Sequence, residues 1–167
     1  MNDKTGLSSG AASEIESLNQ KLANLEHDWF RLIEGASDGV WDWHLSASRI
    51  YFSNCWKESL GYEPDEIDDV FEEFTSRLHP EDSQGVQQAI IDYVSGRTGY
   101  YSAEFRIRAK DGSYRWIIDR GISVERDEKG KPTRIIGFYT DVTPVHHARE
   151  TIRQQQEKLQ LAVEHGG

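Results

Sequence analysis

The hydrophobic and polar residues between positions 100 and 143 alternate in a way that predicts three β-strands. In the first run the apolar side chains that share one parity are Tyr101, Ala103, Phe105 and Ile107. A period of two residues is typical of a strand that buries one face. Lys110-Asp111-Gly112 follows, and an Asp-Gly pair between alternating runs favours a tight hairpin turn because both residues tolerate positive φ. The stretch therefore predicts an antiparallel meander.

The buried faces of the second and third runs follow from the same rule. In residues 113–125 the apolar parity that we expect to face the core comprises Tyr114, Trp116, Ile118, Ile122 and Val124. A polar turn at residues 127–132 leads to a third run, residues 133–140, in which we expect Ile136 and Phe138 to face inward. Ile117 and either Ile135 or Tyr139 then lie on the outer parity. We therefore expect other elements to cover part of both faces of the sheet.

The N-terminal part of the chain predicts a long amphipathic helix. Residues 1–12 are small and polar and are expected to be disordered, whereas a helix over residues 13–34 is expected to start with Ser13 as its N-cap. Apolar residues spaced alternately by three and four form one seam: Ile15, Leu18, Leu22, Leu25, Trp29 and Leu32. This spacing is typical of a coiled coil between two chains, and equally of one helix packed against its own sheet. Both hold if the first half pairs with another chain and the Trp29 end covers the sheet.

The segment between this helix and the meander predicts a β-hairpin followed by short helices. Apolar residues alternate over residues 40–45, and after a turn at 46–48 a second apolar run covers residues 49–53. Helical spacing then continues in short pieces, of which residues 83–95 form the best helix, with Gly96 after it. The predicted order is a helix, two strands, several helices, three strands and a final helix.

The meander ends at a sharp junction with a C-terminal helix over residues 144–167. Asp141 or Thr143 can cap this helix, and Pro144 suits its first turn. The seam again alternates steps of three and four: Val145, Ala148, Ile152, Gln155, Leu159 and Ala162. A seam with alanine and glutamine is weak, which is typical of a linker helix that shifts its register and also of a poorly stable terminal helix.

Composition narrows the functional classes. The 167 residues suggest one domain with extensions, and the net charge of −10 argues against nucleic acid as a partner. One cysteine excludes an internal disulfide, and the scattered histidines show no structural zinc spacing. No apolar run is long enough to span a bilayer, and the polar start is not a secretory signal. We expect a soluble, cytoplasmic chain without membrane contact of its own.

Residues 29–149 resemble a PAS domain with its C-terminal PAC portion. The matching segments occur in the family's order: Gly39-Val-Trp-Asp-Trp43, Tyr51-Phe-Ser-Asn54, Leu60-Gly-Tyr62, His79-Pro-Glu-Asp82, Phe105-Arg-Ile-Arg, Lys110-Asp-Gly112, Tyr114-Arg-Trp116, Gly137 and Asp141-Val-Thr143. The resemblance implies an α+β fold, in which a five-stranded antiparallel sheet carries helices on one face and amphipathic, coiled-coil-like helices flank it. The PAS/PAC core would cover residues 35–143, and residues 144–167 would lead toward a further domain. Ala162-Val-Glu-His-Gly166 is similar to Leu32-Ile-Glu-Gly-Ala36, which suggests that a second such domain follows.

The resemblance also implies an apolar pocket between the sheet and the helices. We expect its lining to include Trp41, Trp43, Phe52, Trp56, Leu60, Phe74, Leu78, Phe105, Ile107, Trp116, Ile118 and Phe138. Asp141 and Thr143 would anchor the exit helix as the family's Asp-Ile-Thr motif does, with Val142 in place of isoleucine and Gln155 in the shifting seam. Homodimerisation would use the seam formed by Ile15, Leu18, Leu22, Leu25 and Trp29.

Cofactor chemistry has weak support in the sequence. Cys55 follows the second strand, whereas the photoactive cysteine of the flavin-binding LOV subset lies on a later helix, so a buried inert thiol is expected. Residues 83–95 contain no histidine for haem, and His44 and His79 are expected to be structural. His146 and His147 are expected to be a solvated pair rather than a phosphoacceptor. We expect no cofactor and no metal, with non-covalent FAD as the alternative because tryptophans can stack on its ring: Trp41, Trp43, Trp56 and Trp116.

These observations favour a non-catalytic sensory and relay module of a bacterial histidine kinase or cyclic-di-GMP enzyme. Its core would respond to a small ligand and change the hold of the sheet on the flanking helices. One alternative is a ligand-free dimerisation spacer that sets the geometry of a downstream output domain, and a second is a flavin-binding redox sensor. An enzyme within this chain is a third option, which turnover of ATP or GTP by the 167 residues alone would support.

Overall fold

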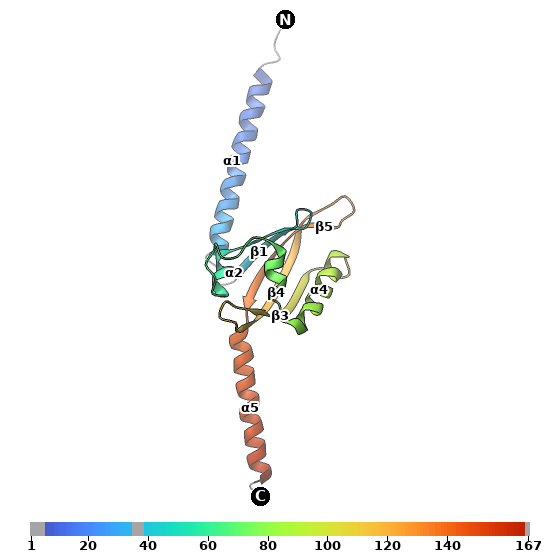
Figure 1. Cartoon of the computed structure of the whole chain (residues 1–167). Helices are drawn as coiled ribbons and strands as arrows, with labels where there is room; N and C mark the ends of the chain where they lie inside the picture. The colour runs from blue at the N-terminus through green and yellow to red at the C-terminus, as the bar shows by residue number, and fades with distance from the viewer. Residues whose placement is uncertain (1–5, 35–38, 166–167) are drawn as a thin grey trace. The chain divides into compact units, whose positions relative to one another are not determined.

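The structure, a computed structural model, describes the backbone of residues 6–34 and 39–165 and the side chains of residues 10–25 and 39–164. The chain divides into two units, residues 1–36 and residues 37–167. The first unit contains helix α1, Gly6–Glu34. The second contains the sheet and every other described helix (Figure 1).

The second unit is built on a five-stranded antiparallel sheet with the order β2-β1-β5-β4-β3. The strands are β1 (Gly39–His44), β2 (Arg49–Phe52), β3 (Tyr101–Arg108), β4 (Tyr114–Arg126) and β5 (Pro132–Asp141). The hairpin β1–β2 joins the meander because β1 pairs with β5, with Trp41 opposite Gly137. The predicted fold class is confirmed.

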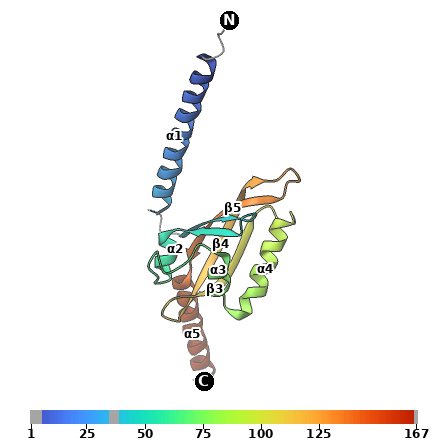
Figure 2. The same cartoon turned by 45° about the horizontal axis from the view of Figure 1, so that its top comes forward.

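Short helices cover one face of this sheet, and their termini follow local capping rules. The helices are α2 (Asn54–Ser59), α3 (Phe71–Thr75) and α4 (Pro80–Val94), and α4 runs beside β3 (Figure 2). Helix α4 begins three residues before the predicted Ser83 because Pro80 suits its first position, where no N–H is needed. The His79 Nδ1 atom accepts a hydrogen bond from the Glu81 amide at 3.2 Å, which caps this start.

The buried parity of β4 and β5 is the reverse of the prediction. Ile117, Asp119 and Gly121 face the core, whereas the predicted inward residues lie on the other face: Tyr114, Trp116, Ile118, Ile122 and Val124. In β5, Ile135 and Tyr139 are each 2% exposed and Phe138 is 45% exposed. The outer parity is therefore the more apolar one in the sequence, and the inner parity is rich in glycine.

The indole of Trp41 explains the reversal. A Cβ atom at Gly121 or Gly137 would come within 2.6 Å and 2.1 Å of this ring, so the ring occupies the space of two missing side chains. Gly121 and Gly137 are cross-strand partners, and Trp41 lies opposite Gly137 on β1. The core side chain over this part of the sheet thus comes from a neighbouring strand, β1. The alternation of residues within β4 or β5 does not reveal such a contribution.

The N-terminal helix starts earlier than predicted. Helix α1 begins at Gly6, so residues 6–12 are helical rather than disordered and Ser13 lies inside the helix instead of capping it. Ala11 and Ala12 favour this extension because alanine is the strongest helix former. The predicted seam residues Ile15, Leu18, Leu22 and Leu25 are each more than half exposed, while the side chains of Trp29 and Leu32 lie outside the described residues.

The C-terminal helix follows the sheet directly. Helix α5 covers Thr143–His165 and starts where β5 ends (Figure 1). The final strand is therefore followed at once by an outgoing helix, one residue earlier than predicted. Among the described residues, no helix is both long and apolar enough to cross a membrane.

Candidate functional site

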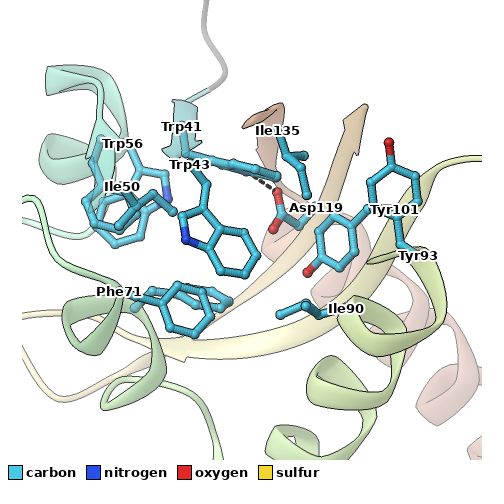
Figure 3. Close-up of a pocket in the computed structure, with 12 residues that line it drawn as sticks. Trp41, Trp43, Ile50, Trp56, Phe71, Ile90, Tyr93, Tyr101, Asp119 and Ile135 are labelled. Atoms are coloured by element: carbon cyan, nitrogen blue, oxygen red, sulfur yellow. Dashed lines mark hydrogen bonds between the residues drawn. The ribbon is translucent and has the colours of Figure 1, made fainter. Parts of the chain in front are cut away.

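A small aromatic cavity lies between the inner face of the sheet and helices α2, α3 and α4 (Figure 3). Its free volume is about 30 Å³, which is space for water-sized molecules. The lining residues come from every layer around it: Trp41, Trp43, Ile50, Phe52, Trp56, Phe71, Phe74, Ile90, Tyr93, Tyr101, Asp119 and Ile135. Because this free volume is so small, a larger molecule enters only if a lining side chain moves.

The expected pocket residues separate into three groups. Those that line the cavity are Trp41, Trp43, Phe52, Trp56 and Phe74. Others are buried in the same core but away from the cavity: Leu60, Leu78, Phe105 and Ile107. Trp116, Ile118 and Phe138 lie on the outer face of the sheet and cannot line it, as a consequence of the reversed parity of β4 and β5.

The cavity has a closed floor and a more open rim. Phe52 and Trp56 stack with ring centroids 4.2 Å apart in its buried part, and Trp41 meets Tyr101 edge-on at 6.0 Å. Trp43 and Phe71 are only partly buried and stack almost parallel, with centroids 4.6 Å apart and an angle of 8°. The stacked pair Trp43–Phe71, together with the partly buried Ile90, therefore forms the part of the lining that solvent reaches.

Asp119 is the lining residue that sequence reasoning missed. Its side chain projects from β4 into the aromatic group, and the Trp41 Nε1 atom donates a hydrogen bond to its Oδ1 atom at 2.6 Å (Figure 3). The Tyr101 hydroxyl is a second hydrogen-bond partner. Burial raises the pKa of the Asp119 carboxyl to about 7, although both hydrogen bonds oppose this shift. The one signal in the sequence was its parity, shared with Ile117, which pointed outward under the predicted register.

The tyrosines around Asp119 are also affected by burial. The pKa of the Tyr101 hydroxyl is raised well above its usual value by burial and by the neighbouring Asp119 charge. Burial likewise raises the pKa of Tyr139, whose hydroxyl is 3.4 Å from the Ser59 Oγ atom. Asp119 is therefore the group in this cluster whose charge changes near neutral pH.

A second feature connects β4 to the start of α5. The Trp116 amide donates a hydrogen bond to Thr143 Oγ1 at 2.8 Å, and the Trp116 carbonyl accepts one from the Val142 amide at 2.8 Å. The Asp141 carboxylate accepts a hydrogen bond from the Thr143 amide at 2.8 Å. Thr143 is 5% exposed. The Asp-Val-Thr segment is therefore fastened to the backbone of Trp116 and also caps α5.

The side chain of Trp116 reinforces this junction, and His146 is part of it. The ring of His146 stacks on Trp116 with centroids 4.1 Å apart and an angle of 6°, and its Nε2 atom lies 2.7 Å from Glu104 Oε1. The expectation that His146 is solvated is wrong, because the first turn of α5 returns its side chain to the sheet; His147 is exposed. Gln155, the third expected relay residue, is exposed further along α5.

Arg106 extends this stack toward α4. Its guanidinium carbon lies 5.1 Å from the centre of the Trp116 ring, and its nitrogen atoms donate hydrogen bonds to both Asp82 carboxylate oxygens at 2.7 and 2.9 Å. The Arg106 hydrogen bond lowers the pKa of the Asp82 carboxyl. A continuous set of contacts thus runs from the first turn of α4 through β3 and β4 to the first turn of α5.

The family model of the PAS fold matches residues 49–139, more than half of the chain. The chain belongs to the PAS family. A PAS domain is a sensory module and not a catalytic one, so this chain is not an enzyme in its own right.

Related proteins place this PAS domain among signalling proteins. A solved sensory box histidine kinase/response regulator from Burkholderia thailandensis is 33% identical, with a TM-score of 0.66, and the match covers 78% of this chain and 97% of that one. Sensor protein FixL from Bradyrhizobium diazoefficiens is 29% identical over 127 residues, which are 76% of this chain and 25% of that protein. Probable diguanylate cyclase DgcE from Escherichia coli is 28% identical over 134 residues, 78% of this chain and 12% of that protein. The chain thus spans a quarter or less of these two relatives.

The PAS cavity does not match a flavin or a haem as it stands. Aromatic side chains fill the space that an isoalloxazine ring would need, because the free volume is about 30 Å³. No histidine is among the lining residues in the described part of the chain, so none is placed to ligate haem iron there. Cys55 is partly buried in α2 and is not among the lining residues. Within the described residues, no group of His, Cys, Asp and Glu is arranged to hold a metal ion.

Proposed function

We propose that this PAS domain is a sensory and relay module in which a change at the aromatic cavity alters the attachment of α5 to the sheet. The observation that carries the proposal is the double role of β4. Asp119 and Ile117 face the core from this strand, and Trp116, next to Ile117, binds the first residues of α5 through its amide, its carbonyl and its ring. Neighbouring residues of one strand share a backbone even when their side chains lie on opposite faces. A shift of β4 toward or away from the cavity therefore displaces Trp116 as well.

Thr143 offers the sharpest test of this relay. The change Thr143→Val keeps the shape of the side chain but removes the oxygen that accepts a hydrogen bond from the Trp116 amide. We expect it to abolish the difference in output between signalling states in the parent protein or in a fusion to a kinase or cyclase domain. One lost buried hydrogen bond costs about 1 to 2 kcal/mol, so the fold should survive. Asp141→Ala should act in the same direction because it removes the cap of α5.

Thr151→Val provides a matched control. Thr151 lies on α5, and its hydroxyl donates to the His147 carbonyl at 3.0 Å within the helix, away from the sheet. Circular dichroism should show that all variants are folded, and an output assay should show normal regulation for Thr151→Val alone. The relay proposal fails if folded Thr143→Val retains the full regulatory range.

A second candidate function, the ligand-free dimerisation spacer, is favoured by the small free volume of about 30 Å³. In this alternative the flanking helices pair two chains and only set the geometry of an output domain. The two functions differ in their response to small molecules. A sensor should show a ligand-dependent rise in thermal midpoint, whereas a spacer should show none across a metabolite library. A cytoplasmic location and a downstream output domain in the same chain stay predictions under both.

A further inference from the structure

The cavity combines one buried carboxylate with many aromatic ring faces, and this combination indicates a class of ligand. Asp119 is 5% exposed and receives hydrogen bonds from the neutral groups of Trp41 and Tyr101. Among the described residues that line the cavity, none is lysine, arginine or histidine. When Asp119 is ionised, its negative charge is therefore buried without a cation, although buried charges in proteins are normally paired.

The surrounding rings favour a positive charge at the same place. The faces of tryptophan, tyrosine and phenylalanine carry negative electrostatic potential and attract cations, most strongly in a desolvated site. Trp43 and Phe71 at the rim and Tyr101 beside Asp119 supply such rings on different sides of the cavity (Figure 3). A carboxylate partnered only by neutral donors and enclosed by aromatic rings is chemically complementary to an ammonium group.

From this geometry we infer that the cavity binds a small organic cation, an amine or a methylated ammonium, with Asp119 as its counter-ion and the aromatic rings as its cage. The inference rests on the proposed sensory function and names the ligand class of that site. Since the free volume is about 30 Å³, entry of a methylated ammonium requires the partly buried pair Trp43–Phe71 to separate. Binding should therefore alter the environment of Trp43.

Tetramethylammonium and choline are suitable probes for the intact chain, and 3,3-dimethylbutan-1-ol is the neutral analogue of choline with nearly the same shape. Titration calorimetry and tryptophan fluorescence should show binding of the cations and at least about tenfold weaker binding of the neutral alcohol. Asp119→Asn keeps an oxygen for the Trp41 indole but removes the charge, so cation affinity should fall by a similar factor. Trp43→Leu should weaken binding as well because it removes one ring of the cage.

The pH dependence of binding gives an independent readout. Because the cation needs ionised Asp119, affinity should rise with pH up to about 7 and then level off, and Asp119→Asn should lose this dependence. The titratable groups that face Asp119 are the hydroxyls of Tyr101 on β3 and Tyr139 on β5, and Tyr93 lines the cavity from α4. Burial raises the pKa of Tyr101 and Tyr139, so these groups do not titrate in this range.

Asp65→Asn is the matched control, because it removes the same charge from an exposed position in the loop before α3. It should bind cations as the unchanged chain does. Equal binding of choline and its neutral analogue, unchanged affinity in folded Asp119→Asn, or no cation binding at all would each overturn the inference. None of these results touches the relay proposal, which stands or falls with the Thr143→Val output assay.

Discussion

At the scale of single residues, Asp119 links the cavity to the energetics of the whole domain. A carboxyl group in an unfolded chain titrates near pH 3.9, whereas burial raises the pKa of Asp119 to about 7 in the folded protein. Between these two values the folded state holds a proton that the unfolded state has lost. The neutral form is the one that the aromatic core tolerates, so ionisation of Asp119 opposes folding.

The sign of this linkage gives a prediction for stability. Asp119 destabilises the fold progressively as pH rises from about 4 to about 7, by roughly 1.4 kcal/mol per pH unit at most, and its effect is constant above that range. Asp119→Asn should therefore gain stability relative to the unchanged chain as pH rises from 5 to 8. Urea unfolding at pH 5, 6, 7 and 8 measures this difference. A difference that does not vary with pH would show that Asp119 titrates normally.

Asp65→Asn again serves as a control in the same unfolding series. Because Asp65 is exposed, loss of its charge should not reproduce the pH-dependent gain in stability expected of Asp119→Asn. The buffer for this series should contain no small organic cation. A bound ammonium would stabilise ionised Asp119 and so weaken the dependence of the unfolding free energy on pH. Urea unfolding with and without tetramethylammonium thus distinguishes an Asp119 carboxylate that has no counter-ion from one that is paired with a bound cation.

At the scale of elements, Trp41 organises three strands at once. Its ring lies over the glycines at which β4 and β5 face each other, and its indole nitrogen bonds Asp119 two residues before Gly121. The central strands pack closely because neither Gly121 nor Gly137 carries a side chain there. The aromatic side chain that covers this part of the sheet therefore comes from β1 and not from β4 or β5.

This packing predicts opposite effects for the same substitution at two glycines. In Gly137→Ala the new methyl group would overlap the Trp41 ring and the Arg120 carbonyl, so we expect a loss of about 1 to 3 kcal/mol or more. Gly85→Ala in α4 meets nothing within 4 Å, and alanine favours a helix over glycine, so a gain of about 0.5 to 1 kcal/mol is expected. Chemical denaturation of both variants measures the two signs. A neutral Gly137→Ala would contradict the role given to Trp41.

The same elements show what the sequence could and could not predict. Local patterns were enough for the order of strands and helices, because Lys110-Asp111-Gly112, Gly96 and the Asp-Val-Thr segment each act on their own neighbours, although Pro80 was not recognised as the first residue of α4. Which side chains of β4 and β5 face the core depends instead on Trp41, which is far away in the sequence. Since that error turned Asp119 outward and Trp116 inward, the cavity carboxylate was missed and a junction residue was assigned to the pocket. His146 was missed for a similar reason, because its stacking partner Trp116 precedes it by a whole strand.

At the scale of the whole molecule, both flanking helices expose apolar side chains at heptad-like spacing. On α1 these residues are Ile15, Leu18, Leu22 and Leu25, and on α5 they include Val145, Ile152 and Leu159, which are 47%, 55% and 68% exposed. Apolar stripes on long helices are usually buried against another helix.

The seam on α1 predicts a homodimer that can be broken without touching the PAS core. Leu18→Glu combined with Leu22→Glu places four like charges in the pairing surface of two chains, so we expect conversion of dimer to monomer in sedimentation or light scattering at micromolar concentration. Ser17→Glu combined with Asn24→Glu adds two charges per chain on the side of the same helix that faces away from the seam and should leave the dimer intact. Because residues 37–167 form a separate compact unit, the thermal midpoint of the core should be unchanged in both pairs. A monomeric unchanged chain, or a Leu18/Leu22 variant that stays dimeric, would place the pairing surface elsewhere, with α5 as the next surface to test.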